Sequence, residues 1–229
     1  MLRLAHPARP VCVSAHAGVT PEQQLLLQGF LDELAHWNER VNLTAVPPDL
    51  AWERHIGDSL RLSSAAPAVA GDVCIDVGTG GGVPGIPLAI LRPDIEMVLL
   101  DSDRKKVGFL TYVCGLLGLD NVSTLTARAE DAGHDPVHRE AYDLAVSRAT
   151  AGAPALCELC LPLVRVGGRM AAILRTAPLA AAEARVAAQA CGGGEPVAAA
   201  PEVMVVSKVT STEAQYPRRA GIPVRRPLV

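Results

Sequence analysis

The sequence lacks the features of a membrane or secreted protein. Its 229 residues contain no run of about 18 or more apolar residues, the length that a bilayer-spanning helix needs. Near the start, His6, Arg9 and Pro10 interrupt the apolar segment, which is too short for a secretory signal. We therefore expect a cytoplasmic protein without a membrane partner.

Excess positive charge and a disulfide framework are also missing. The formal net charge is −3 and the isoelectric point about 6.1, so composition alone demands no nucleic-acid partner, and any RNA contact must come from a local basic patch. Most of the six cysteines lie in apolar stretches, where a reduced thiol packs as a small hydrophobe. With 49% hydrophobic residues, the chain can bury one principal core with an appendage.

Two helices are predicted at the N-terminal end. Thr20, followed by Pro21 and by Gln23 at the third helical position, has the form of a capping box that starts a helix. Apolar residues at helical spacing follow it. A second helix is expected over residues 49–62, where apolar residues recur four apart.

Beyond residue 72 the pattern changes to short apolar runs separated by helical segments. The predicted strands cover residues 73–77, 95–100, 122–125, 142–147, 169–174 and 203–209. Such alternation is typical of an open, twisted, mainly parallel α/β sheet with helices on both faces. The fold class that we predict is therefore Rossmann-like.

The most informative motif is a glycine-rich loop after the first strand. It reads D-V-G-T-G-G-G from Asp76 to Gly82, and Gly78 and Gly80 allow the backbone to approach a ligand closely. Gly80, Gly82 and Gly85 also satisfy the dinucleotide pattern, so the glycines alone leave an NAD(P)-dependent oxidoreductase open.

Two acids favour S-adenosylmethionine as the cofactor. Asp76 places a carboxylate beside the loop, where it would repel a pyrophosphate but hold an α-ammonium group or an ordered water. Asp101 ends the second predicted strand, where a carboxylate can bind both ribose hydroxyls. An alternative for Asp76 is that it merely caps loop amides.

Several motifs in one order resemble a known family, from about residue 24 to 227. They are D-V-G-T-G-G-G-V-P-G-I-P from Asp76, W-N from Trp37 with N-L-T from Asn42, R-H-I-G-D-S-L from Arg54, L-L-D-S from Leu99, S-R-A from Ser147 and Y-P-R-R-A-G-I-P from Tyr216. Together they resemble the guanine-N7 methyltransferases of small-subunit ribosomal RNA, also called glucose-inhibited division protein B. One departure is visible: Arg175 and Thr176 stand where the family usually has lysine and glycine.

The resemblance implies both the site and the organisation of the chain. Residues implied in the cofactor site are Gly78, Val83, Ala129, Glu130 and Arg148. We expect three parts: a disordered segment over 1–19, a helical cap over 20–66, and a methyltransferase domain with a basic C-terminal segment over 67–229.

The RNA-binding candidates lie at both ends of the chain. His55 and Asp58, three apart on one helix, could orient each other, act as an acid/base pair, fix the cap to the sheet or face the RNA. The C-terminal candidates for phosphate contacts are Arg218, Arg219, Arg225 and Arg226.

A zinc site is not expected. His134 and His138 with Cys157 and Cys160 have suitable ligand types, but the predicted strand over 142–147 separates the two pairs by roughly 20 Å. We predict that no metal is bound.

The sequence thus predicts an S-adenosylmethionine-dependent methyltransferase that acts on N7 of a guanine in 16S ribosomal RNA, free or in the small ribosomal subunit. The alternatives are a small-molecule or protein methyltransferase on the same fold and, further away, an oxidoreductase. Because guanine N7 carries a lone pair and no proton, we expect no residue to act as a general base. Arg148 is expected to help position the guanine.

Overall fold

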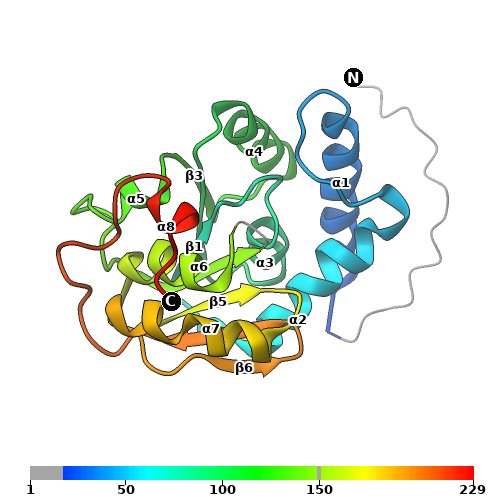
Figure 1. Cartoon of the computed structure of the whole chain (residues 1–229). Helices are drawn as coiled ribbons and strands as arrows, with labels where there is room; N and C mark the ends of the chain where they lie inside the picture. Colours follow the sequence, from blue (N-terminus) through cyan, green and yellow to red (C-terminus); the bar gives the residue numbers. More distant parts are fainter. Residues whose placement is uncertain (1–17, 149–150) are drawn as a thin grey trace, which may run out of the picture.

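The computed structural model describes residues 18–148 and 151–229, which form one sheet covered by helices (Figure 1). The strand order is β3-β2-β1-β4-β5-β7-β6. The first five strands in this order pair in parallel. Strand β7 runs antiparallel to both of its neighbours, β5 and β6. The strands are β1 (Val73–Val77), β2 (Glu96–Asp101), β3 (Val122–Thr126), β4 (Tyr142–Arg148), β5 (Val164–Ile173), β6 (Val197–Ala200) and β7 (Val203–Ser207). The predicted open, mainly parallel α/β sheet is confirmed.

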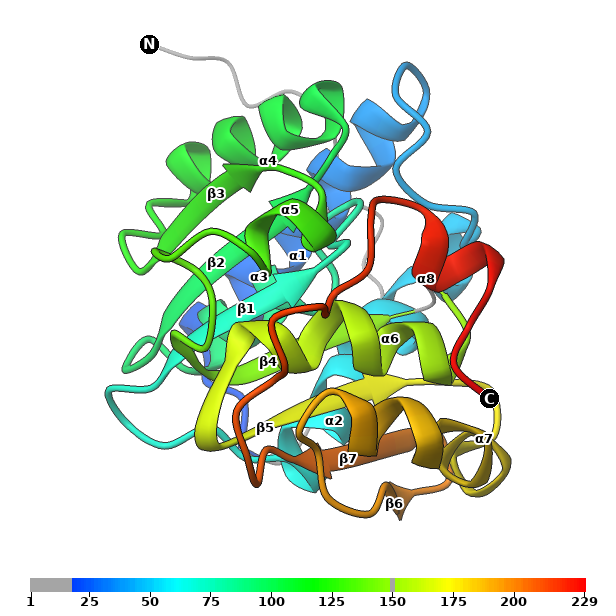
Figure 2. The ribbon, with the colours of Figure 1, turned by 60° about the vertical axis from the view of Figure 1, so that its left-hand side comes forward.

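Helices cover both faces of the sheet and enclose two apolar cores. Neighbouring strand residues point to opposite faces, so Cys74 belongs to one core and Ile75 to the other. One face carries α1 (Pro21–Asn38), α2 (Asp58–Ala65), α3 (Gly85–Leu91) and α4 (Arg104–Leu117). The other carries α5 (Ala129–Ala132), α6 (Ala153–Cys160) and α7 (Ala177–Ala190). The short α8 (Ile222–Arg225) lies beside α6 (Figure 2).

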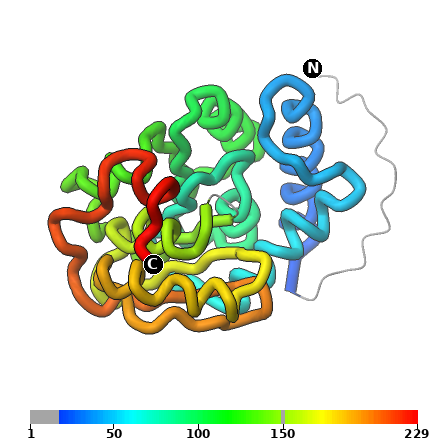
Figure 3. Tube along the Cα trace, in the orientation of Figure 1, coloured from blue at the N-terminus to red at the C-terminus, as the bar shows by residue number. Residues whose placement is uncertain are grey.

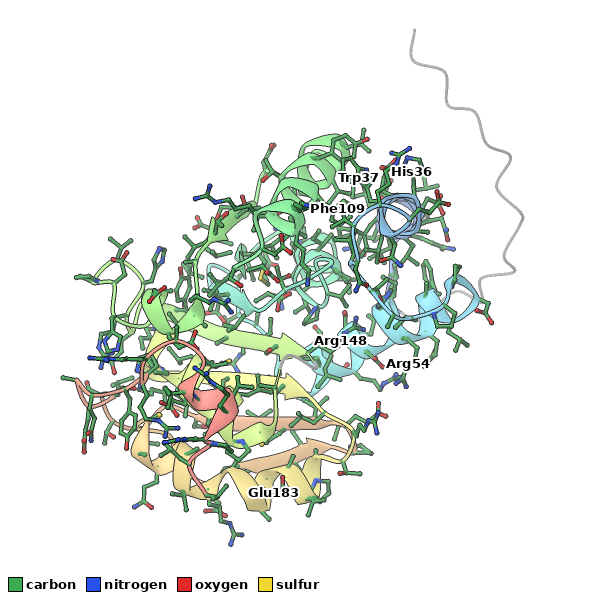
Figure 4. All side chains as sticks on the ribbon, turned by 45° about the horizontal axis from the view of Figure 1, so that its top comes forward. His36, Trp37, Arg54, Phe109, Arg148 and Glu183 are labelled. Atoms are coloured by element: carbon green, nitrogen blue, oxygen red, sulfur yellow. The ribbon has the colours of Figure 1, made fainter. Side chains whose placement is uncertain are left out.

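The N-terminal helix is held directly against the sheet domain. Thr20 and Gln23 form the predicted capping box, and the Gln23 side chain also donates to the carbonyl oxygens of Ile90 and Leu91 at the end of α3. At the other end of α1, the Trp37 ring lies 6.0 Å from that of Phe109 on α4 (Figure 4). The expected cap therefore shares one core with α3 and α4; its separation as a domain stays a prediction.

The second predicted helix is broken into three parts. A 3-10 turn, η1 (Pro48–Leu50), leads into a π-helical segment, η2 (Trp52–Gly57), and then into α2. Because the backbone N–H of Asp58 reaches back to the carbonyl of Glu53, five residues earlier, the turn is wider than an α-turn. The expected spacing of four is lost, and His55 and Asp58 are both buried.

Short elements escaped the sequence analysis. Neither β6, α5 nor α8 was predicted, because four residues are too few for a period to show. Strand β5 starts at Val164, ahead of the predicted 169, and runs through two glycines. Within the described ranges no helix has the length and apolarity to cross a membrane. The disorder expected over 1–19 falls almost wholly outside the described residues.

Candidate active site

The glycine loop follows β1 with three left-handed backbone positions. Gly78, Gly80 and Gly82 have φ of 70°, 57° and 90°, values that side chains rarely tolerate. A Cβ on Gly82 would also lie 2.6 Å from Cδ1 of Ile86. The loop therefore needs glycine both for its turns and for its packing on α3.

Asp76 holds this loop from beneath. Its side chain is fully buried, and Oδ2 accepts hydrogen bonds from Thr79 Oγ1 at 2.6 Å and from the Gly85 N–H at 2.8 Å. Oδ1 is buried without a partner among the described residues. Burial raises the pKa of Asp76 to about 6. One oxygen thus caps loop groups, which is the alternative considered for this residue.

Asp101 ends β2 at the opposite side of the loop. Its Oδ2 accepts from the Gly80 N–H at 2.9 Å, and its Oδ1 accepts from the Asp103 N–H at 2.9 Å. These two bonds fix the carboxylate at the carboxyl edge of the sheet, on the wall of a cavity.

That first cavity, about 630 Å³ in volume, opens at the carboxyl ends of β1, β2 and β4. It brings together five of the predicted cofactor residues: Gly78, Asp101, Ala129, Glu130 and Arg148. Lys106 from α4 and three residues of the C-terminal segment, Gly221, Val224 and Arg225, also line it.

The C-terminal wall is anchored by buried charges. Oε1 of Glu130 accepts from the Gly221 N–H at 2.7 Å. The guanidinium of Arg218 pairs with Glu158, whose side chain is fully buried, at 2.6 Å between Nη2 and Oε2. Arg139 adds hydrogen bonds to the carbonyl oxygens of Thr212 and Tyr216. Figure 3 traces this segment, from orange to red, across the molecule to the C-terminus.

Arg148, at the end of β4, stands between two cavities. Its Nη1 donates to the carbonyl oxygen of Arg54, whose side chain lies near that of Arg148 in Figure 4. The same nitrogen lies 3.8 Å from Oδ2 of Asp58. Burial lowers the pKa of Arg148, while the nearby carboxylates of Asp58 and Asp76 oppose this shift. Asp58 itself is held by Arg61, so a chain of charges links the helical cap to the end of β4.

The second cavity, about 950 Å³, lies between the cap and the carboxyl ends of β4 and β5. Its walls include the far side of the glycine loop, residues 43–46, Arg54, Asp58, Val83, residues 173–175 and Glu202. Gly78 and Arg148 belong to both cavities. Asn38 shapes the cap loop, since its Oδ1 accepts from the N–H groups of Leu43 and Thr44. The two cavities therefore meet at the start of the glycine loop.

Comparison with known proteins identifies the family. A family model described as rRNA small subunit methyltransferase G matches residues 23–198. A protein of Moorella thermoacetica named ribosomal RNA small subunit methyltransferase G is 42% identical over 230 residues, which cover 94% of this chain and 95% of that protein. The protein of the same name in a Roseiflexus species is 44% identical over 207 residues, 86% and 88% of the two chains.

The chain belongs to the rRNA small subunit methyltransferase G family.

Solved structures agree with the fold of a methyltransferase. An S-adenosylmethionine-dependent O-methyltransferase of Thermotoga maritima superposes with a TM-score of 0.53 at 16% identity, covering 80% of this chain and 72% of that one. A methyltransferase of Aquifex aeolicus gives 0.50, also at 16% identity, covering 68% and 90%. At such identities the likeness establishes a Rossmann-like fold alone. Together with the family, it confirms the predicted methyltransferase class and its cofactor, S-adenosylmethionine.

In this family member, His55 and Asp58 do not pair with each other. His55 is fully buried, with Nε2 3.3 Å from Thr44 Oγ1, and Nδ1 has no partner among the described residues. Burial, with the charge of Arg148 second, lowers the pKa of His55 to about 4. The histidine is thus a neutral, buried support for a loop within the cap and has no surface to offer RNA. The contact from this pair to the sheet is made by Asp58, which lies 3.8 Å from Arg148 at the end of β4.

The C-terminal arginines separate into distinct roles. Arg218 is committed to Glu158, and Arg225 lines the first cavity. Arg219 and Arg226 are exposed. The prediction grouped all four by charge alone, because a sequence shows which residues are basic and not which of them have buried partners.

The discounted zinc residues lie apart in the family fold. His134 Nε2 contacts the carbonyl oxygen of Pro217 at 2.7 Å, and His138 Nδ1 contacts the Tyr142 hydroxyl at 2.7 Å. Cys157 and Cys160 are buried in α6, where burial raises the pKa of both thiols. No group of three or more such ligands converges within the described ranges.

Proposed function

We propose that this chain transfers the methyl group of S-adenosylmethionine to N7 of a guanine in 16S ribosomal RNA, with the RNA free or within the small ribosomal subunit, in the cytoplasm. The observation that carries the proposal is the junction of two cavities at Gly78 and Arg148. A transfer between a cofactor and a large substrate requires two such sites with one shared boundary.

The first cavity fits the cofactor. Asp101, already oriented by two backbone N–H groups, would accept from the ribose hydroxyls, and Ala129 and Glu130 would border the adenine. Of the glycine loop, Gly78 lines this cavity, whereas Gly80 and Val83 line the second one. When bound, S-adenosylmethionine supplies an electrophilic methyl group on a positively charged sulfur.

The chain itself needs only to bind and orient the reactants. Guanine N7 has a free lone pair and no proton to lose, so no general base is required. His55, which is close enough to Arg148 for its charge to lower the histidine pKa, is buried with a pKa of about 4 and is not placed for such a role. Arg148 is tied to the Arg54 carbonyl and lies near Asp58, which holds its positive charge back from the purine that gains charge on methylation.

Exposed cations around the second cavity support an RNA substrate. Arg54 and Arg175 lie on its walls and are exposed, so phosphates can reach them. Arg175 is one of the two residues that depart from the family pattern, yet it keeps the positive charge of the usual lysine. Arg219 and Arg226 are further candidates for phosphate contacts.

The decisive experiment is nucleoside mapping of 16S ribosomal RNA by mass spectrometry, with and without the gene. We expect the loss of one 7-methylguanosine, restored by the purified protein on isolated subunits or on naked RNA. An unchanged set of 7-methylguanosines, with cofactor binding intact, would point to a small-molecule or protein substrate instead.

A further inference from the structure

We propose that Glu202 recognises the target guanine in the second cavity by accepting hydrogen bonds from its N1–H and exocyclic N2 amino group; the inference rests on the function proposed above. It assigns to this cavity a purine base held by its Watson–Crick edge. N7 lies on the other side of the purine ring, and so can face the junction at Gly78 and Arg148.

Glu202 is well placed for this role. It sits in the connection between β6 and β7, and its backbone carbonyl accepts from the Leu174 N–H at 2.8 Å. That bond fixes the residue at the carboxyl end of β5, on the same cavity wall as Arg175. The backbone is therefore held, while the side chain is 37% exposed and able to reach a ligand.

The other carboxylates near the second cavity are already committed. Asp58 also lines it, but its side chain is only 6% exposed and its two oxygens face Arg61 and Arg148. Asp76 lies beneath the glycine loop and is fully buried. The ion pair of Glu202 is a long one, with 4.0 Å between Arg61 Nε and Glu202 Oε2. Of the acids on the described part of the cavity wall, Glu202 is thus the one with capacity for a base.

The chemistry of the bases makes a carboxylate selective for guanine. Guanine presents two adjacent donors, N1–H and the N2 amino group, which match the two oxygens of one carboxylate. Adenine and cytosine have an acceptor nitrogen at the centre of this edge, and uracil has a single donor between two carbonyls, so each would oppose a carboxylate.

The same contact favours the reaction as well as binding. Methylation of N7 places a positive charge on the purine, which makes N1–H a stronger donor. An ionised carboxylate bound there gains strength as the charge develops, so its effect should appear in the rate of the bound complex and not only in affinity. Arg54 and Arg175 would hold the flanking phosphates while Glu202 selects the base.

The test uses the full chain and RNA substrates that differ in one group. Single-turnover methylation is measured on RNA with guanosine at the target and on the same RNA with inosine, which keeps N1–H and N7 but lacks the N2 amino group. Wild type should prefer guanosine, and Glu202→Gln, which replaces an acceptor with a donor, should slow methylation of guanosine by about tenfold to a hundredfold. The guanosine-to-inosine ratio should fall in the same variant.

Two controls separate recognition from damage to the fold. Glu202→Asp should recover part of the ratio, and Glu195→Gln, in an exposed pair with Arg185, should behave as wild type. Cofactor affinity by calorimetry should be equal in all four proteins. A Glu202→Gln variant that keeps the wild-type ratio overturns the role of Glu202, whereas wild type that methylates neither RNA overturns the proposed function itself.

Discussion

The two cavities on either side of Arg148 are built in different ways. In the first, Asp101 and Glu130 are held by backbone N–H groups, so the carboxylates are oriented before any ligand arrives. In the second, the rim carries Arg54 and Arg175, both exposed, above a loop shaped by Asn38. A small cofactor of constant shape suits a rigid site, whereas a large polyanion suits an open charged rim.

The largest effect should come from the boundary that both cavities share. Gly78→Asp places a Cβ at φ 70° and a charge beside the cofactor, so we expect no measurable binding of S-adenosylmethionine by calorimetry. Because Gly78 also lines the second cavity, the added negative charge should weaken RNA binding as well. Unaltered cofactor affinity in a variant that unfolds at the wild-type temperature would refute the loop assignment.

The second-largest effect should come from removing the ion pair that anchors the C-terminal wall of the first cavity. Arg218→Ala leaves Glu158 buried with only the Arg218 backbone N–H as a donor from this segment, and we expect a loss of roughly 2 to 3 kcal/mol in the free energy of unfolding. Cofactor affinity should fall with it, because Gly221 and Val224 line the first cavity. The matched control is Arg185→Ala, which removes an exposed pair and should cost less than about 1 kcal/mol in urea denaturation. Equal losses in the two variants would contradict the anchoring role.

Substitution of Asp101 should change ligand binding in the first cavity only. We expect Asp101→Ala to weaken cofactor binding by roughly 1.5 to 3 kcal/mol, the worth of hydrogen bonds to a charged group, and to leave RNA affinity unchanged. Asp101→Asn keeps an acceptor for one N–H and should lose less. A parallel drop in RNA affinity would show that the two sites are not independent.

The smallest expected effect is that of pH on the bound complex. Single-turnover rates should be flat between about pH 6.5 and 8.5, in wild type and in His55→Ala alike, because burial puts the pKa of His55 at about 4. Stability should behave differently. Since the folded-state pKa lies below the unfolded value of about 6.5, His55 contributes stability above that pH and loses it as the pH falls toward 4. A bell-shaped rate profile that disappears in His55→Ala would identify a general base.

Much of the first cavity could be predicted from the sequence because parallel strands align their carboxyl ends. Once 73–77 and 95–100 are strands, the residues that follow them must share one edge of the sheet, which places Gly78 and Asp101 together. Ala129 and Glu130 came from the resemblance alone.

The second cavity could not be predicted from the sequence in the same way. Its walls join the cap, the end of β5 and the connection between β6 and β7, and no periodicity links these segments. The π-helical turn at Trp52–Gly57 also altered which residues of the cap are buried. Buried charged residues could not be predicted from the sequence either. Hydropathy would place Lys208 in solvent, but this lysine is only 2% exposed and donates to the carbonyl oxygens of Leu161 and Cys191.

The C-terminal wall also sets the moment at which this chain becomes competent during its own synthesis. Glu130 is translated 91 residues before the Gly221 N–H that it binds, and a nascent chain folds from its N-terminal end. The sheet can assemble before this segment is made, but the cofactor site then lacks one side. Folding of the sheet and completion of the cofactor site are therefore separate events, joined by a contact between residues 91 positions apart.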